Sequence, residues 1–209
     1  MALVLTTTEE LVARAKSLVE PGSRRLLGVT GPPGAGKSTV AAQLVAALDG
    51  ETRLVPMDGF HLADAALIEM GRRDRKGAPD TFDGEGYVAL LRRLREAKEP
   101  CVWAPEFRRE IEDAIAGAIP VPREVPLVIT EGIYLLLAQE PWGEVRTLLD
   151  EIWYVRPPHA LRVERLIARH VAFGKSPDEA REWVLRSDEA NTLVIEAAAE
   201  GADVVIELE

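Results

Sequence analysis

Residues 31–38 of the chain have the composition and spacing of a phosphate-binding loop. The sequence GPPGAGKS matches the pattern GxxxxGK[ST] at every fixed position. In such a loop, glycines allow backbone N–H groups to surround a polyphosphate, the lysine reaches the β- and γ-phosphates, and the serine hydroxyl binds Mg²⁺. We therefore predict binding of a nucleoside triphosphate with Mg²⁺, through contacts from Gly31, Pro32, Pro33, Gly34, Ala35, Gly36, Lys37, Ser38 and Thr39.

The segments on either side of this loop supply the context that the motif requires. Arg25–Thr30 has the pattern of a short buried strand, and the Ala-, Leu- and Val-rich segment Ser38–Leu48 has that of a helix. A chance glycine turn that only caps a helix is the alternative. The fixed positions of the motif are all present and both flanking segments have the expected patterns, which argues against this alternative.

Two carboxylates follow other expected strands, at the edge of a parallel sheet where ligands bind. Asp58 follows Thr52–Met57 and could accept the proton of a substrate hydroxyl during phosphoryl transfer. Glu131 follows Leu127–Thr130 and could position Mg²⁺ directly or through water. The structural alternative for Asp58 is a turn signal, and the structural alternative for Glu131 is a polar residue that ends a strand. His61 could bond the substrate or orient Asp58, although a histidine satisfied within the fold explains it equally well.

The remaining pattern predicts an α/β fold in which strands alternate with helices, as in βαβ units with a parallel sheet. We expect one domain over residues 1–209 and a long, mobile loop over Gly71–Thr81. The expected helices include Thr7–Leu18 and Gly84–Lys98. The expected strands are Arg25–Thr30, Thr52–Met57, Cys101–Ala104, Leu127–Thr130, Glu151–Val155 and Asp203–Leu208.

Residues 157–191 are expected to form a lid of two helices joined by a tight turn. In the first helix, Val163, Leu166 and Ile167 form an apolar stripe, and three arginines, Arg162, Arg165 and Arg169, are spaced to share another face. Gly174 ends it, and Ser176-Pro177-Asp178-Glu179 predicts a capping box at the start of the next. A solvated basic face is the alternative to a lid.

The composition of the chain limits the classes of partner that it is expected to bind. The 209 residues carry a formal net charge of -10, which disfavours nonspecific binding to nucleic acid or to an anionic membrane. The single cysteine, Cys101, allows no internal disulfide and suits a reducing cytoplasm. No apolar run reaches the length of about 18 residues needed to span a bilayer. The expected partner is a small-molecule acceptor; the oligomeric state, including a homodimer, stays open.

Taken in order, the phosphate loop, Asp58-Gly59-Phe60-His61 and Leu127–Gly132 resemble the P-loop kinases that include uridine kinase, bacterial pantothenate kinase and phosphoribulokinase. Two further segments, 75–83 and 186–191, are most similar to bacterial proteins called fructose transport system kinases. The resemblance covers nearly the whole chain. It implies a P-loop NTPase fold of the nucleoside/nucleotide kinase type, with three α/β/α layers, a parallel sheet and a helical lid.

The resemblance also implies roles for matching residues. Asp58 would be the base toward the acceptor hydroxyl, Glu131 would serve the metal, and Arg165 and Arg169 would approach the ATP phosphates. The loop that begins at Lys76 resembles a segment near the acceptor region of pantothenate kinases, and we expect His61, Arg75, Lys76 and Arg109 to contact the acceptor. Arg108 departs from the family pattern, because a smaller polar or acidic residue is expected there.

These observations predict an ATP-dependent kinase that transfers the γ-phosphoryl group to a hydroxyl of a small metabolite, such as the sugar fructose. A uridine-like nucleoside kinase and a pantothenate-like kinase are alternatives. A nucleotide-binding switch protein without an acceptor is an alternative from another class. A GTPase switch is disfavoured because the chain's only asparagine, Asn191, is not followed by lysine and no NKxD-type motif exists.

Overall fold

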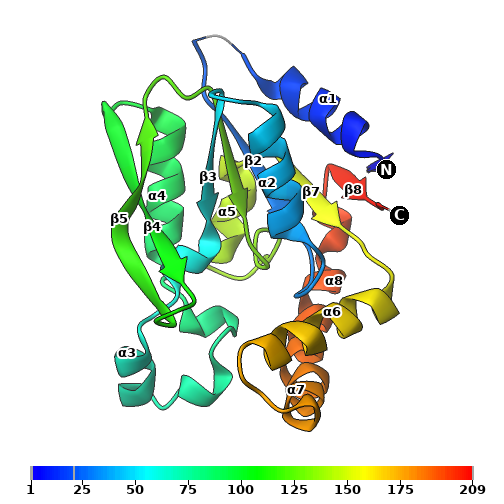
Figure 1. Ribbon diagram of the computed structural model, residues 1–209. Coiled ribbons are helices and arrows are strands. Elements are labelled where there is room, and N and C mark those ends of the chain that lie inside the picture. The colour runs from blue at the N-terminus through cyan, green and yellow to red at the C-terminus, as the bar shows by residue number, and fades with distance from the viewer. Residues whose placement is uncertain (1, 21, 209) are drawn as a thin grey trace.

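A parallel β-sheet forms the centre of the molecule (Figure 1). The computed structural model describes residues 2–20 and 22–208, and within them six strands pair in the order β1-β8-β7-β2-β6-β3, each parallel to its neighbours. Their bounds are β1 (Leu3–Leu5), β2 (Arg25–Thr30), β3 (Thr52–Pro56), β6 (Leu127–Glu131), β7 (Glu151–Val155) and β8 (Val204–Ile206). The parallel sheet predicted from the sequence is confirmed, with β1 added at one edge.

Helices cover both faces of this sheet because successive side chains of each strand point to opposite sides. Leu26 and Val128 pack with the helices of one layer, α4 (Gly84–Glu96), α5 (Val145–Leu148) and α8 (Glu189–Ala197). The neighbouring residues Leu27 and Ile129 pack on the opposite face with α1 (Thr8–Leu18) and α2 (Lys37–Ala47). The result is the three-layer α/β/α fold of P-loop NTPases.

The predicted strand Cys101–Ala104 exists, but its expected place in the parallel sheet is wrong. It belongs to β4 (Cys101–Arg108), which pairs antiparallel with β5 (Asp113–Pro122) in a separate two-stranded sheet. Val102 and Ala104 are buried in the core beside α4, while Trp103 between them is 54% exposed. The alternation that a one-sided hairpin needs is therefore present in β4. The Ala-, Gly- and Pro-containing β5 has a weaker strand pattern, and sequence analysis missed it.

The expected long loop at Gly71–Thr81 contains two short 3-10 turns, η2 (Arg73–Arg75) and η3 (Pro79–Thr81), after the helix α3 (Asp64–Glu69). Distant partners hold it in place. The Lys76 Nζ donates to Asp64 Oδ1 at 2.6 Å, and the Tyr134 hydroxyl donates to the Gly77 carbonyl at 2.6 Å. Such contacts across the fold leave no local pattern. Mobility of the segment stays a prediction.

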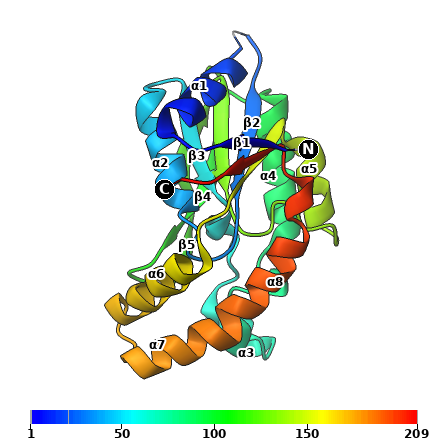
Figure 2. The same ribbon diagram turned by 90° about the vertical axis from the view of Figure 1, so that its right-hand side faces the viewer.

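The expected lid region begins with α6 (His159–Ala172), which runs away from the sheet (Figures 1 and 2). The chain then returns through α7 (Pro177–Trp183), the π-helical turn η5 (Val184–Asp188) and α8, which form one continuous helical rod. At its start, Ser176 Oγ accepts from the Glu179 N–H at 3.3 Å and Glu179 Oε2 accepts from the Ser176 N–H at 2.9 Å. The predicted capping box is thereby confirmed.

Three short 3-10 turns complete the chain: η1 (Met57–Phe60), η4 (Trp142–Glu144) and η6 (Ala199–Gly201). In residues 2–20 and 22–208, every helix is too short or too polar to cross a bilayer.

Candidate active site

The phosphate loop joins β2 to α2 and has a backbone that only glycine adopts easily at its key positions. Gly31, Gly34 and Gly36 have φ values of 143°, 77° and 94°. At Gly34 space is limiting as well, because an added Cβ would lie 2.7 Å from Leu166 Cγ on α6. The loop therefore has a defined shape with α6 packed against its tip.

Lys37 is the first residue of α2, and its side chain folds back over the loop. It is 8% exposed, and its Nζ donates to the carbonyls of Gly31 and Pro32, each at 3.0 Å. Burial lowers the pKa of Lys37 to about 8, although the charges of Glu131 and Asp58 oppose the shift. An anionic ligand in the loop would favour the charged ammonium.

Neighbouring strands bring the two predicted carboxylates to the same edge of the sheet. Glu131 ends β6, and Pro56, opposite Glu131 in the ladder, ends β3 two residues before Asp58. The Ser38 hydroxyl donates to Glu131 Oε1 at 3.2 Å. Burial and the nearby Asp58 raise the pKa of Glu131, and Lys37 partly offsets this.

The oxygen atoms of Ser38 and Glu131 fit a magnesium site of the kind that kinases use. Mg²⁺ prefers oxygen ligands and is usually held by one or two carboxylates together with substrate phosphates and water. Among residues 2–20 and 22–208, no group of three or more His, Cys, Asp and Glu side chains could hold a metal ion. A metal at Ser38 and Glu131 would accordingly depend on the nucleotide for further ligands.

The turn that carries Asp58 is pressed against the β4–β5 hairpin. A Cβ at Gly59 would lie 2.5 Å from the Pro105 carbonyl oxygen of β4, so the close approach requires glycine. From the end of the same hairpin, Arg109 Nη2 lies 3.5 Å from Asp58 Oδ2. This hairpin, of which only the strand Cys101–Ala104 was predicted from the sequence, is therefore one wall of the site.

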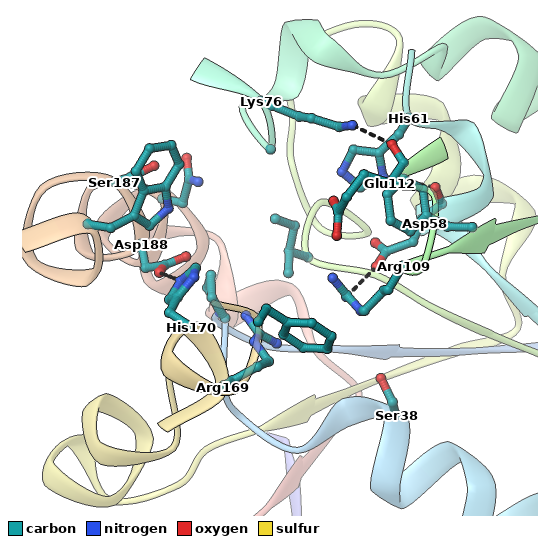
Figure 3. Close-up of a pocket in the computed structure, with 18 of the residues that line it drawn as sticks. Ser38, Asp58, His61, Lys76, Arg109, Glu112, Arg169, His170, Ser187 and Asp188 are labelled. Atoms are coloured by element: carbon teal, nitrogen blue, oxygen red, sulfur yellow. Dashed lines mark hydrogen bonds and ion pairs between the residues drawn. The ribbon is translucent and has the colours of Figure 1, made fainter. Parts of the chain in front are cut away.

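A cavity of about 430 Å³ lies between the phosphate loop, this hairpin and the lid helices (Figure 3). That volume is in the range of small-molecule sites. Many of the residues predicted from the sequence line it together: Pro33, Gly34, Lys37, Ser38, Asp58, His61, Lys76, Arg109, Glu131 and Arg169. Arg75 is directed elsewhere and forms an exposed ion pair with Asp80.

His61 lines the cavity three residues after Asp58. Its Nδ1 lies 2.9 Å from the Asp58 carbonyl oxygen, and its ring contacts Phe82 and Phe107, with ring centroids 4.0 and 4.8 Å away. Burial lowers the pKa of His61 despite the nearby Asp58. A neutral ring must therefore carry its hydrogen on Nδ1 to donate to that carbonyl, which leaves Nε2 as an acceptor.

The three arginines of α6 have different surroundings, which corrects the expected division between a core stripe and a basic face. Arg162 is 1% exposed and Leu166, one turn later, is fully buried. Arg169 extends into the cavity (Figure 3), where partial desolvation and the nearby Arg109 lower its pKa although the residue stays accessible to solvent. Arg165 lies beside the loop, its Nη1 3.8 Å from the place of a Cβ on Gly36. The first half of α6 packs on the phosphate loop, whereas its end lies over the cavity.

Comparison with known proteins agrees with this geometry. The model of the Phosphoribulokinase / Uridine kinase family matches residues 26–208. The chain belongs to this family. It is a P-loop kinase that transfers phosphate to an alcohol group of a small molecule.

Members and structures similar to the chain carry several names. A protein of Aspergillus versicolor, named as ATP-dependent kinase-like, is 40% identical over 131 residues, or 59% of this chain and 76% of its own length. A Schizosaccharomyces pombe protein provisionally named as a uridine kinase is 31% identical over 217 residues, which cover 97% of this chain and 91% of the relative. A crystal structure from Silicibacter sp. TM1040, provisionally named as a fructose transport system kinase, has a TM-score of 0.88 and 36% identity and covers 96% of this chain and 99% of that one.

Several cavity residues of this family member were missed by sequence analysis. They come from the hairpin, from the segment that follows β6 and from the lid, and include Phe107, Glu112, Ile133, His170, Phe173, Lys175, Trp183, Ser187, Asp188 and Asn191. The segment 186–191 was singled out by resemblance, but its pattern alone assigned no role. Asp188 is 9% exposed and accepts from His170 Nε2 at 2.9 Å, so it joins η5 to the end of α6.

Proposed function

We propose that the protein is an ATP-dependent kinase that phosphorylates a hydroxyl group of a small polyol, such as a sugar. The convergence of Lys37, Asp58 and Arg169 on one cavity carries this proposal. It provides, in one space, a phosphate-binding cation, a carboxylate that can accept a hydroxyl proton, and a second cation from the lid.

In this proposal, the position of each residue in the cavity determines its role in phosphoryl transfer. Backbone N–H groups of Gly31 and residues 34–39, together with the Lys37 ammonium, would hold the phosphates, and Arg169 would approach them from the lid with Arg165 beside the loop. Ser38 and Glu131 would hold Mg²⁺, which when bound would neutralise phosphate charge. Asp58 orients the acceptor hydroxyl and takes its proton. Lys37 and Arg169 stabilise the charge that develops on the transferred group.

The other half of the cavity supports a polyhydroxylated acceptor. Phe82 and Phe107 offer apolar ring surface, and Asp58, the His61 Nε2 and Glu112 offer hydrogen-bond acceptors beside it. Hydroxyl groups satisfy such acceptors by donating. Lys76 and Arg109 add donors at the same wall.

A screen for acceptor-dependent ADP release tests the proposal. Purified protein with MgATP would be offered fructose, other sugars, uridine and pantothenate in separate reactions. We expect a sugar to stimulate ADP release most. Preference for uridine would favour a nucleoside kinase, and preference for pantothenate would favour a pantothenate-like kinase. ADP release that no acceptor changes would favour a nucleotide-binding switch protein.

Glu131→Gln is expected to raise the Mg²⁺ concentration that gives half-maximal activity. The amide lacks the negative charge that Ser38 and Glu131 would present to the metal, and loss of a residue that supports metal binding commonly costs roughly 10- to 100-fold in metal affinity or activity. Titration of activity with Mg²⁺ at fixed ATP measures the effect. Glu124→Gln, away from the cavity, serves as control. An unchanged Mg²⁺ requirement in Glu131→Gln contradicts the assigned metal role.

Arg169→Ala and Arg75→Ala form a matched pair, because only Arg169 lines the cavity. Arg169→Ala is expected to lower kcat by roughly 10- to 100-fold. This is less than the loss of kcat expected when a rigid, buried hydrogen-bond donor is removed, because the lid is accessible to solvent. Arg75→Ala removes only a surface ion pair, worth about 0–1 kcal/mol of stability. Steady-state kinetics measures both. Equal activity of the two variants would argue that the end of α6 is only a solvated face.

A further inference from the structure

A buried arginine outside the proposed chemistry connects the phosphate loop to the lid. Arg162 is 1% exposed although it lies on the same helix as the accessible Arg169. Its Nη1 donates to the Pro33 carbonyl at 3.4 Å, and its Nη2 donates to Glu189 Oε1 at 2.5 Å. A buried charge persists only when it is paired, so both ends of this contact constrain the structure.

Packing strengthens the link at the loop end. The Arg162 carbonyl oxygen lies 3.0 Å, and Leu166 Cγ 2.7 Å, from the place of a Cβ on Gly34. The phosphate loop therefore cannot shift toward α6 without moving that helix. Interiors packed this closely transmit displacement instead of absorbing it.

At the other end, Glu189 is the first residue of α8, immediately after η5. Burial tends to raise its pKa, but hydrogen bonds from Arg162 and His159 outweigh this and lower it, so the residue is held as a carboxylate. The adjacent Asp188 lines the cavity, and so does Asn191 one turn further on. The ion pair thus ends at the part of the lid that faces the proposed acceptor.

From this arrangement we propose that Arg162 is a positioning residue which, through Glu189, couples nucleotide binding at the phosphate loop to the placement of the η5–α8 wall of the cavity. The inference rests on the proposed function, since it assumes that the loop binds nucleotide. Arg162 touches neither substrate; it acts by holding α8 to the loop. Ligand occupation of the loop then orders the wall that carries Asp188 and Asn191.

Amide hydrogen exchange with MgADP as the probe tests this coupling without any acceptor. In the wild type, MgADP should slow exchange in the loop, residues 31–38, and also in residues 184–197. Glu189→Gln replaces the charged partner of Arg162 by a neutral one of the same shape, which weakens the hydrogen bond. We expect this variant to keep loop protection, while the MgADP-induced protection of residues 184–197 falls by at least about 5-fold, the lower end of typical couplings between sites.

Two further variants sharpen the comparison. His159→Gln removes the exposed partner of Glu189 and should behave as wild type, because the link to the loop stays. Should Glu189→Gln fail to fold, the double replacement Arg162→Met with Glu189→Met removes both charges together and leaves no unpaired buried ion. It should show the same loss of coupling. A merely structural pair would change exchange equally with and without MgADP.

The outcomes separate the two proposals. If MgADP protects neither segment of the wild type, nucleotide binding itself fails, and the proposed function fails with it. If the loop is protected and residues 184–197 are not, or if their protection survives in Glu189→Gln and in the double variant, the kinase assignment stands and the coupling is overturned.

Discussion

Replacement of Lys37 by alanine is expected to reduce phosphoryl transfer by roughly 1,000-fold or more, at or beyond the upper end of what loss of one preorganised donor costs. The Lys37 ammonium is buried over the phosphate loop, held by the carbonyls of Gly31 and Pro32. Removing it takes away the cation that is expected to bind the transferring phosphoryl group. The loss should be greater in kcat than in MgATP affinity, because charge on that group changes in the transition state. Steady-state kinetics and nucleotide titration measure the two effects.

Lys37→Met, which keeps most of the side-chain volume, should be as inactive as Lys37→Ala. Lys98→Ala is a suitable control because that lysine is exposed and paired with Glu96. Thermal unfolding of each variant shows whether the fold is kept. Turnover of Lys37→Ala near the wild-type rate, with the same acceptor, would remove the basis for the assigned loop chemistry.

Asp58→Asn is expected to lower kcat by roughly 100- to 10,000-fold, the usual contribution of a general base. Asparagine keeps the size of the side chain and can still hydrogen-bond, but it has no basic carboxylate to take the acceptor proton. MgATP binding should survive, since the variant leaves Lys37 and the phosphate loop unchanged. The measurement is kcat with the acceptor found in the screen, together with the MgATP dissociation constant.

The matched control is Asp83→Asn. Asp83 caps α4 through a 2.9 Å hydrogen bond from the Gly86 N–H, and asparagine caps a helix about as well as aspartate. This variant should therefore keep wild-type activity. If Asp58→Asn stays within about threefold of wild type, well below the range for a base, proton removal lies elsewhere, and His61 becomes the next residue to replace.

The sequence alone predicted those parts of the site whose function depends on short segments. The phosphate loop requires glycines at particular backbone positions followed by Lys37 and Ser38, and these requirements are local. Asp58 and Glu131 were found because each follows a strand, and parallel strands present their carboxyl ends at one edge of the sheet. The roles assigned to these residues stay predictions, although the structure brings the residues together as expected.

Tertiary packing decided what no short pattern could. Periodicity spaces Arg162 and Arg169 on nearly the same side of α6, yet Arg162 is buried against the phosphate loop and Arg169 faces the cavity. The hairpin of β4 and β5 has strand-like alternation in β4, but its separation from the main sheet depends on packing against α4 and η1.

The residues that line the cavity show the same contrast between local sequence and tertiary packing. Arg75 and Lys76 are sequence neighbours with similar charges, but Lys76 reaches Asp64 and the cavity, whereas Arg75 pairs with Asp80 at the surface. Asp188 and Asn191 reach the site because the lid returns through η5 over the cavity. A residue's local conformation depends largely on its neighbours along the chain. Its burial and its partners depend on segments that only folding brings together.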